Sequence, residues 1–160
     1  MTYAYTIHPS PVGKLKLVAS DRGVAAILWE NDREDRVPLG AMTEQPDHPV
    51  LVETKCQLDE YFAGTRNRFD LPLDFHGTDF QKSVWAALLR IPFGETRTYA
   101  EIARELGRPT AFRAVGAANG KNPISIVAPC HRVIGTDGSL TGFAGGLKGK
   151  QFLLELEGAA

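Results

Sequence analysis

The chain has 160 residues and a net charge of −1, a length that suits one domain or two small ones sharing a core. Hydrophobic residues make up 43% and charged residues 23%, which indicates a soluble globular protein and excludes a disordered one. The sequence shows neither an apolar run of about 20 residues nor a secretory signal, so we expect a cytoplasmic protein with no membrane partner.

The two halves of the chain differ in charge. Residues 1–79 carry 8 Lys/Arg and 13 Asp/Glu, whereas residues 80–160 carry 10 Lys/Arg and 6 Asp/Glu, so their net charges are −5 and +4. Charge runs of this kind are usually solvated faces. The split is also typical of a partner-binding module joined to a solubilising one.

The cysteines and histidines form no metal-binding pattern. Cys56, Cys130 and four histidines show neither C-x-x-C nor H-x-x-x-H spacing, so we expect no metal site. The two cysteines could form a disulfide, but a cytosolic location favours reduced thiols.

The first half predicts a small antiparallel sheet and one helix. Alternating side chains over residues 3–8, 14–19 and 24–29, separated by turn residues, predict three strands. The charged stretch 31–48 predicts a loop, and the spacing of apolar residues over 49–62 predicts a helix that ends near Gly64. Cys56 falls within this helix and is interpreted as a small core residue, and residues 69–73 alternate as one more strand.

The second half begins, after a joint at 74–79, with three predicted helices. Two capping boxes, Thr78 with Gln81 and Thr98 with Glu101, predict the starts of the first two. The third opens at Thr110, after a turn containing Gly107, and is rich in Ala and Gly. Two short helices joined by a tight turn are a candidate helix-turn-helix, although ordinary helix packing gives the same pattern.

The chemistry of the chain is concentrated around one cysteine. An apolar run, 124–128, leads into Pro129-Cys130-His131-Arg132-Val133 and predicts a strand with Cys130 at its edge. An isolated cysteine is more often a buried structural thiol. A thiol beside an imidazole, which lowers its pKa, and after a proline that stiffens the backbone, is typical of a nucleophile. Residues 135–139 predict a hairpin loop, 141–146 a flexible segment that could wall a pocket, and 147–156 a last amphipathic helix.

The order of these features resembles the O6-alkylguanine-DNA alkyltransferase family. The resemblance runs from about residue 80 to 158, and it is carried by Arg-Ala-Val-Gly at 113–116, Asn122-Pro123, residues 129–133 and the closing Leu-Glu-Gly at 156–158. The first half is similar in layout only. Family members move an alkyl group from the O6 of guanine, and in some cases the O4 of thymine, to an active cysteine, once per molecule and without a cofactor.

The resemblance implies an α+β fold in two domains. Residues 1–76 are expected to form a ribonuclease-H-like domain with a small antiparallel sheet and a helix, and residues 77–160 a helical DNA-binding domain that holds the helix-turn-helix and the active cysteine. The partner it implies is double-stranded DNA, bound as a monomer through the minor groove with the damaged guanine flipped out. Cooperative binding along DNA is left open.

The resemblance also implies the residues of the reaction. Cys130 matches the alkyl acceptor, and His131 matches the base that takes the thiol proton through a water, oriented by Glu157. Asn122 matches the residue that holds the active-site turn. Tyr99 matches the donor that neutralises the leaving guanine, and it also crowds the 3′ phosphate.

A second set of residues is implied for DNA and for the base pocket. Arg113 matches the arginine that replaces the flipped base in the stack, and the positions near the phosphates are matched by Gln81, Tyr99, Ala100, Arg108 and Thr136. The carbonyls of Cys130 and Val133 are expected to read the guanine amine, and the Phe143-Ala144 segment to close over the O6. Phe143 replaces a common tyrosine and Ala144 a serine or glycine, so side-chain contributions there are lost while the N–H of Ala144 remains.

Three other functions fit parts of the pattern. A non-catalytic lesion sensor of the alkyltransferase-like type carries another residue at the nucleophile position, so Cys130 favours the transferase. A helix-turn-helix regulator predicts a dimer with a sequence-specific site. A cysteine hydrolase is disfavoured because the histidine adjacent to Cys130 cannot readily adopt the usual base geometry.

Overall fold

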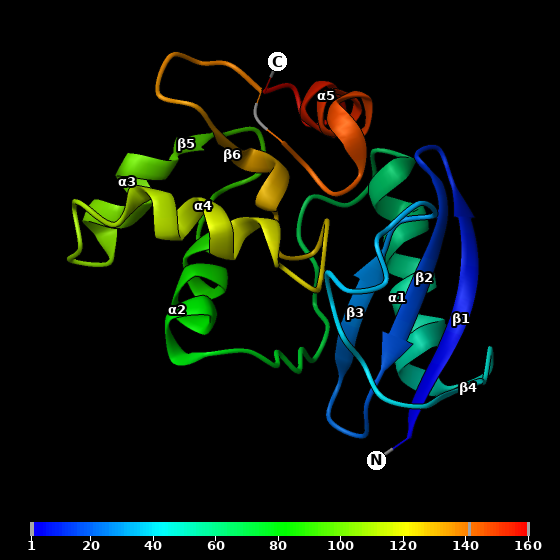
Figure 1. Ribbon diagram of the computed structural model, residues 1–160. Coiled ribbons are helices and arrows are strands. Elements are labelled where there is room, and N and C mark those ends of the chain that lie inside the picture. Colours follow the sequence, from blue (N-terminus) through cyan, green and yellow to red (C-terminus); the bar gives the residue numbers. More distant parts are fainter. Residues whose placement is uncertain (1, 141, 160) are drawn as a thin grey trace.

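A sheet backed by one helix lies beside a group of shorter helices in the computed structural model, which describes residues 2–140 and 142–159 (Figure 1). The sheet has the order β3-β2-β1-β4, in which β1 (Tyr3–Ser10), β2 (Gly13–Ala19) and β3 (Val24–Leu28) are antiparallel neighbours. The three predicted strands are therefore confirmed. The predicted loop 31–48 is wrong in part, because β4 (Met42–Glu44) pairs parallel to β1. This strand is only three residues long and mostly exposed, so it lacks an alternating apolar signal.

One face of the sheet is covered by α1 (Pro49–Phe62), as the sequence predicts. Leu15 and Leu17 of β2 pack with Leu51 and Leu58 of α1 in a core that also contains Ile124 from the second half, so the two halves share a core. Cys56, in contrast, is exposed, and its interpretation as a core residue is wrong. The helical period turns Cys56 away from the buried face of α1.

The predicted strand at 69–73 is also wrong. Only Leu73 is bridged to the sheet, opposite Val24, and the flanking bonds run from the Val24 N–H to the Pro72 carbonyl and from the Asp74 N–H to the Val24 carbonyl. Pro72 has no N–H with which to extend the ladder. The backbone at Pro72 packs so closely against Gly23 that only glycine fits at position 23. A Cβ on Gly23, whose φ is +155°, would stand 2.4 Å from the Pro72 carbonyl oxygen.

The second half holds α2 (Asp79–Leu88), α3 (Tyr99–Glu105) and α4 (Phe112–Gly120), packed around Trp85, Ile102 and Val115. Both predicted capping boxes are present at the starts of α2 and α3. The turn between α3 and α4 contains Gly107 at φ +72°, and the two helices pack together, so the helix-turn-helix is confirmed. The third helix begins at Phe112 rather than at the predicted Thr110, and it has no side-chain cap.

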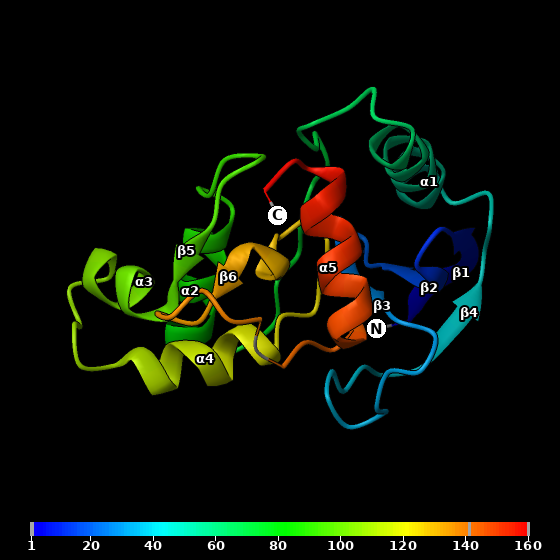
Figure 2. The same cartoon turned by 90° about the horizontal axis from the view of Figure 1, so that it is seen from above.

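The chain then crosses the interface between the halves and returns. The residues Cys130–Arg132 form a 3₁₀ turn, η1, followed by β6 (Val133–Ile134), which pairs parallel to β5 (Arg97–Thr98). Figure 2 shows the last helix, α5 (Gly146–Leu156), lying between α1 and the helices of the second half. The predicted segment 141–146 includes Thr141, which lies outside the described residues.

The predicted strand with Cys130 at its edge is wrong. The run 124–128 is buried, but only Ile124 is bridged to the sheet, opposite Ile27. Ile126 has a φ of +73°, a left-handed conformation that interrupts any extended strand and costs a β-branched residue on the order of 1–3 kcal/mol. The segment that leads into Cys130 is therefore a sharp turn and not a strand.

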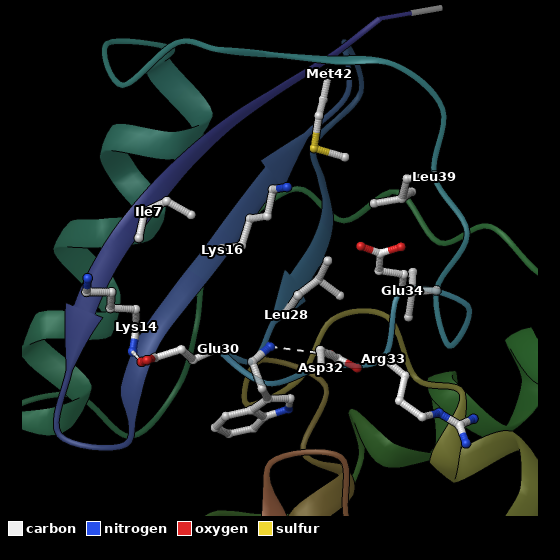
Figure 3. A pocket seen from close by; sticks show the side chains of 12 residues that line it. Ile7, Lys14, Lys16, Leu28, Glu30, Asp32, Arg33, Glu34, Leu39 and Met42 are labelled. Carbon is white, nitrogen blue, oxygen red and sulfur yellow. Dashed lines mark hydrogen bonds between the residues drawn. The ribbon is translucent and has the colours of Figure 1, made fainter.

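The loop after β3 crosses the sheet face opposite α1. It encloses a hollow of about 580 Å³ whose walls include two lysines of β2, Lys14 and Lys16, and the acidic side chains of Glu30 and Glu34 (Figure 3). Apolar side chains such as Met42 complete the wall. No residue of the predicted active site lines this hollow. Within 2–140 and 142–159, every helix is too short or too polar to cross a bilayer.

The same loop is tied to the second half by one buried arginine. Arg36 forms a 2.6 Å ion pair with Asp32, and both side chains are under 10% exposed, at 7% and 8%. The remaining guanidinium nitrogen, Nη1, donates to the backbone carbonyls of Gly120, at the end of α4, and Asn122. The loop, the end of α4 and the approach to Cys130 are therefore held by a single side chain.

Replacing this arginine should strongly destabilise the fold. Arg36→Met leaves Asp32 buried without its partner, and we expect a loss of about 3–5 kcal/mol in the free energy of unfolding, measured by urea titration. The matched control is Arg33→Met, because Arg33 pairs with Asp35 while both side chains are largely exposed (72% and 83%). That pair should contribute less than about 1 kcal/mol. Equal losses in the two variants would contradict this description of the interface.

Candidate active site

The thiol of Cys130 is buried at the start of η1, with 4% of the residue exposed. Its backbone is held on both sides, since its N–H donates to the Ala128 carbonyl at 2.7 Å and its carbonyl accepts from the Val133 N–H and from Asn119 Nδ2 at 3.4 Å. These bonds fix the direction in which the Cys130 side chain leaves the turn.

Asn122 closes the turn that leads to the cysteine. Its Nδ2 donates to the Ala128 carbonyl at 2.8 Å, and its Oδ1 accepts from the Ile124 N–H at 3.1 Å. An amide that bonds the backbone on both sides of a turn replaces the ladder that a strand would supply. Asn122 therefore holds the backbone of the turn that leads into Cys130.

The carboxylate of Glu157, at the C-terminal end of α5, accepts hydrogen bonds from three side chains. His131 Nε2 lies 2.8 Å from Oε2, and Arg132 donates through Nε to Oε1 at 2.7 Å and through Nη2 to Oε2 at 3.0 Å. The Tyr61 hydroxyl donates to Oε2 at 2.6 Å. All of these groups are buried, so the carboxylate has exchanged water for a complete set of protein donors.

This environment sets the charges of the pair. Burial alone raises the pKa of Glu157, but the hydrogen bonds from His131 and Arg132 more than offset that and lower its pKa to about 2. Burial lowers the pKa of His131, against the opposing pull of Glu157. The pair therefore consists of an ionised carboxylate and a neutral imidazole near pH 7.

The histidine uses only one of its two ring nitrogens. Because Nε2 faces the carboxylate, it carries the proton and donates it, which leaves Nδ1 as an acceptor. Nδ1 is buried and has no protein partner among the described residues. A buried acceptor without a partner is costly, so a water or an incoming group is expected to satisfy it.

The sequence led us to expect a lowered thiol pKa, and this expectation is wrong for the protein without DNA. Burial raises the pKa of Cys130, and it outweighs the opposing influence of the Asn122 amide and the positive charges of Arg36 and Lys150. The Lys150 side chain is completely buried on α5 and donates to the Val133 carbonyl at 2.6 Å. The thiol is therefore protonated at rest, with cations nearby that favour its ionised form.

The structure brings three other predicted site residues toward the cysteine, and a fourth, Ala144, packs elsewhere. Cys130 and Val133 share one apolar cluster, against which Tyr99 and Phe143 pack. Tyr99 opens α3, and its ring lies 3.7 Å from the place where a Cβ on Gly116 would stand, so the ring packs close to the backbone of α4. Ala144 packs against the core shared by the halves. Phe143 is also held from the N-terminal half, since its ring packs edge-on against Trp29 at 5.3 Å between centroids.

Apart from Tyr99, the residues predicted to contact DNA lie outside this buried centre. Arg108, Arg113 and Thr136 are exposed, and Ala100 is half-buried in the first turn of α3. The side chain of Gln81, in contrast, is used within the protein, because its Oε1 accepts the Thr78 N–H in the capping box of α2. Five residues of α4 are exposed, namely Phe112, Arg113, Ala114, Ala117 and Gly120, and the last three of these are small.

Three buried residues at the site were missed from the sequence. Arg132 lies inside the quoted motif but was given no role, and Lys150 could have been noticed as a cation on the apolar face of the last helix. Tyr61 had no local signal, because it is 96 residues from Glu157 in the chain. No group of three or more His, Cys, Asp or Glu side chains suited to a metal ion occurs in the part of the chain that the structure describes.

Removing the charge of Glu157 should change both the size and the pH dependence of stability. Glu157→Gln leaves Arg132 buried without an anion, so we expect a loss of about 3–5 kcal/mol at pH 7 in urea titrations. Because the pKa of Glu157 is about 2 in the folded protein and ordinarily 4.5, its contribution is complete above pH 4.5 and is lost as the pH falls toward 2.

The difference between the wild-type and variant proteins should therefore shrink over that pH range. The control is Glu105→Gln, because Glu105 pairs with Arg90 at the surface, where such a change should cost less than about 1 kcal/mol. A difference that stays constant between pH 7 and pH 3 would contradict an ionised, hydrogen-bonded Glu157.

Comparison with known proteins covers both halves. Residues 1–75 match the 6-O-methylguanine DNA methyltransferase ribonuclease-like domain, and residues 79–159 match the DNA binding domain of the same family. Methylated-DNA–protein-cysteine methyltransferases from Mycobacterium bovis and Methanosarcina barkeri are 62% and 48% identical over 154 residues, which is 96% of this chain and 91% and 96% of theirs. The crystal structure of Mycobacterium tuberculosis OGT in complex with DNA superimposes with a TM-score of 0.87 at 45% identity, covering 99% of this chain and 94% of that one. The chain therefore belongs to the 6-O-methylguanine DNA methyltransferase family.

Proposed function

We propose that this protein repairs DNA directly by moving a methyl group from the O6 of guanine to the sulfur of Cys130. The observation that carries the proposal is a buried cysteine followed by a histidine whose ring is held by a buried carboxylate. Family membership and curated relatives named for methyl transfer to a protein cysteine support it. Larger alkyl groups and the O4 of alkylated thymine are further candidate substrates.

The reaction balances without a cofactor. The Cys130 thiolate attacks the methyl carbon, so a carbon–sulfur bond forms while the bond from that carbon to O6 breaks. The electron pair of the broken bond stays on guanine, which takes a proton from the Tyr99 hydroxyl. The thiol gives its proton to His131, and return of one proton to Tyr99 leaves both side chains neutral, so no proton is gained or lost. A thioether has no easy route to hydrolysis, so each molecule reacts once.

His131 and Glu157 prepare the thiol for this attack. In the proposed mechanism a water bridges Cys130 to His131 Nδ1, the acceptor that has no protein partner among the described residues. Glu157 holds the imidazole in the tautomer that presents Nδ1 and stabilises the charge that forms on it. The buried cations near the thiol, Lys150 and Arg36, favour the thiolate once its proton leaves.

The exposed side of α4 is proposed to lie in the minor groove of duplex DNA. Small residues such as Ala114 and Ala117 allow the helix to approach the groove, and the second half carries the positive charge that phosphates require. The target carbon cannot be reached inside a base stack, so the nucleotide must be flipped out, and Arg113 occupies the vacated space. The exposed Arg108 and Thr136 are candidate phosphate contacts.

The remaining predictions for DNA and the base pocket follow the same proposal. Gln81, Ala100 and Tyr99 lie near the phosphates, the carbonyls of Cys130 and Val133 read the guanine amine, and the Phe143-Ala144 segment closes over the base. The protein acts as a cytoplasmic monomer, with residues 1–76 and 77–160 as its two domains. A non-catalytic lesion sensor is the alternative function, and the presence of Cys130 argues against it.

Intact mass provides the test of this function. After incubation with excess duplex carrying one O6-methylguanine, the protein should gain a single methyl group, about 14 Da, on the peptide that contains Cys130. Cys130→Ala should gain nothing, whereas Cys56→Ser should gain the same mass, because Cys56 is exposed and outside the site. Binding to the lesion duplex without any gain would favour the sensor, and a methyl group on Cys56 would contradict the assignment of the nucleophile.

A further inference from the structure

A tyrosine of the N-terminal half contacts the carboxylate that holds the histidine. Tyr61 lies in the last turn of α1, is 1% exposed, and donates its hydroxyl to Glu157 Oε2 at 2.6 Å. The residue therefore reaches from the helix that backs the sheet, across the interface, to the end of α5. Through this contact the N-terminal half touches the carboxylate that holds the proposed base.

Packing alone does not require this hydroxyl. The ring of Tyr61 packs against Phe62, Phe69 and Phe93, at 5.3 to 6.4 Å between centroids, and a phenylalanine would keep all three contacts. A buried phenol hydroxyl costs free energy unless it forms a hydrogen bond, and here that bond is the one to Glu157. Burial and the neighbouring Glu157 charge raise the pKa of Tyr61, so the hydroxyl keeps its proton and acts as a donor.

The hydroxyl shares an oxygen with the histidine. Oε2 of Glu157 accepts from His131, Tyr61 and Arg132, whereas Oε1 accepts from Arg132 alone among the described residues. Arg132 is itself anchored, since its Nη1 donates to the Ile91 carbonyl at 2.6 Å. Arg132 therefore fixes the plane of the carboxylate, while Tyr61 and His131 compete for the negative charge of a single oxygen.

We propose that Tyr61 is a positioning residue for methyl transfer, which acts through Glu157 to set how readily His131 accepts a proton. This inference rests on the proposed function of His131 and Glu157. It gives the N-terminal half a chemical part in the reaction, because α1 supplies the hydroxyl that donates to Glu157 beside the donors of η1. The other charged groups that act on His131 are Arg132, on the same turn, and Lys150, on α5.

The direction of the effect follows from the shared oxygen. A donor on Oε2 withdraws negative charge from the bond to His131, so removing that donor stabilises the protonated imidazole and raises the pKa of His131. A stronger donor at position 61 has the opposite effect. Tyr61 therefore keeps His131 neutral at the pH where it must accept the thiol proton.

The test compares two changes of opposite sign at one position. The pKa of His131 is measured by NMR titration of its ring in the full-length wild-type protein, in Tyr61→Phe and in protein with 3-fluorotyrosine at position 61, whose hydroxyl is the stronger donor. The pKa should rise in Tyr61→Phe and fall with 3-fluorotyrosine. Tyr5→Phe, which removes a hydroxyl on the sheet, is the matched control and should leave it unchanged.

Single-turnover methyl transfer over a range of pH is the second readout. The pH at which the rate rises should move up in Tyr61→Phe and down with 3-fluorotyrosine, while a role in packing alone would change only the melting temperature. An unchanged His131 pKa in either protein would overturn the inference, and 3-fluorotyrosine decides it alone if Tyr61→Phe does not fold. Wild-type protein that transfers no methyl group would instead refute the proposed function, because the NMR titration does not depend on DNA.

Discussion

The structure depends on a carboxylate that stays ionised in the interior. Removing the charge of Glu157 from water carries a cost of several kcal/mol, and it is offset only because every donor around it is well placed. Arg132 supplies two of those donors, and His131 and Tyr61 supply one each. The same arrangement that makes the charge tolerable also fixes the orientation and tautomer of the histidine next to Cys130. Stability and the proposed chemistry therefore rest on one group.

The resting state of the nucleophile follows from the same burial. An exposed thiol such as that of Cys56 is open to oxidants and alkylating agents, whereas Cys130 is buried and its pKa is raised. A protein that reacts once gains from a thiol that is protonated until its substrate arrives. Under the proposed mechanism, His131 supplies the base and Lys150 the positive charge, so the thiolate forms only where the methyl group can be attacked.

The parts of this molecule that were predictable from sequence are those with a local cause. The helix starts at Thr78 and Thr98 depend on side chains three residues apart, and the motif around Cys130 is contiguous. One error arose where the cause leaves no periodic pattern in the sequence: the turn at Cys130 depends on the side-chain amide of Asn122 and on the left-handed backbone of Ile126. Tyr61 could not be found at all, because its partner lies in the other half of the chain.

The most direct measurement of the central claim is the single-turnover rate of methyl transfer by Glu157→Gln, compared with its affinity for the same lesion duplex. If the carboxylate orients His131 as the base for Cys130, the rate falls about 10²-fold or more while the affinity for DNA is retained, since Glu157 is buried. A variant that folds, binds the duplex and transfers methyl at the wild-type rate would contradict the account.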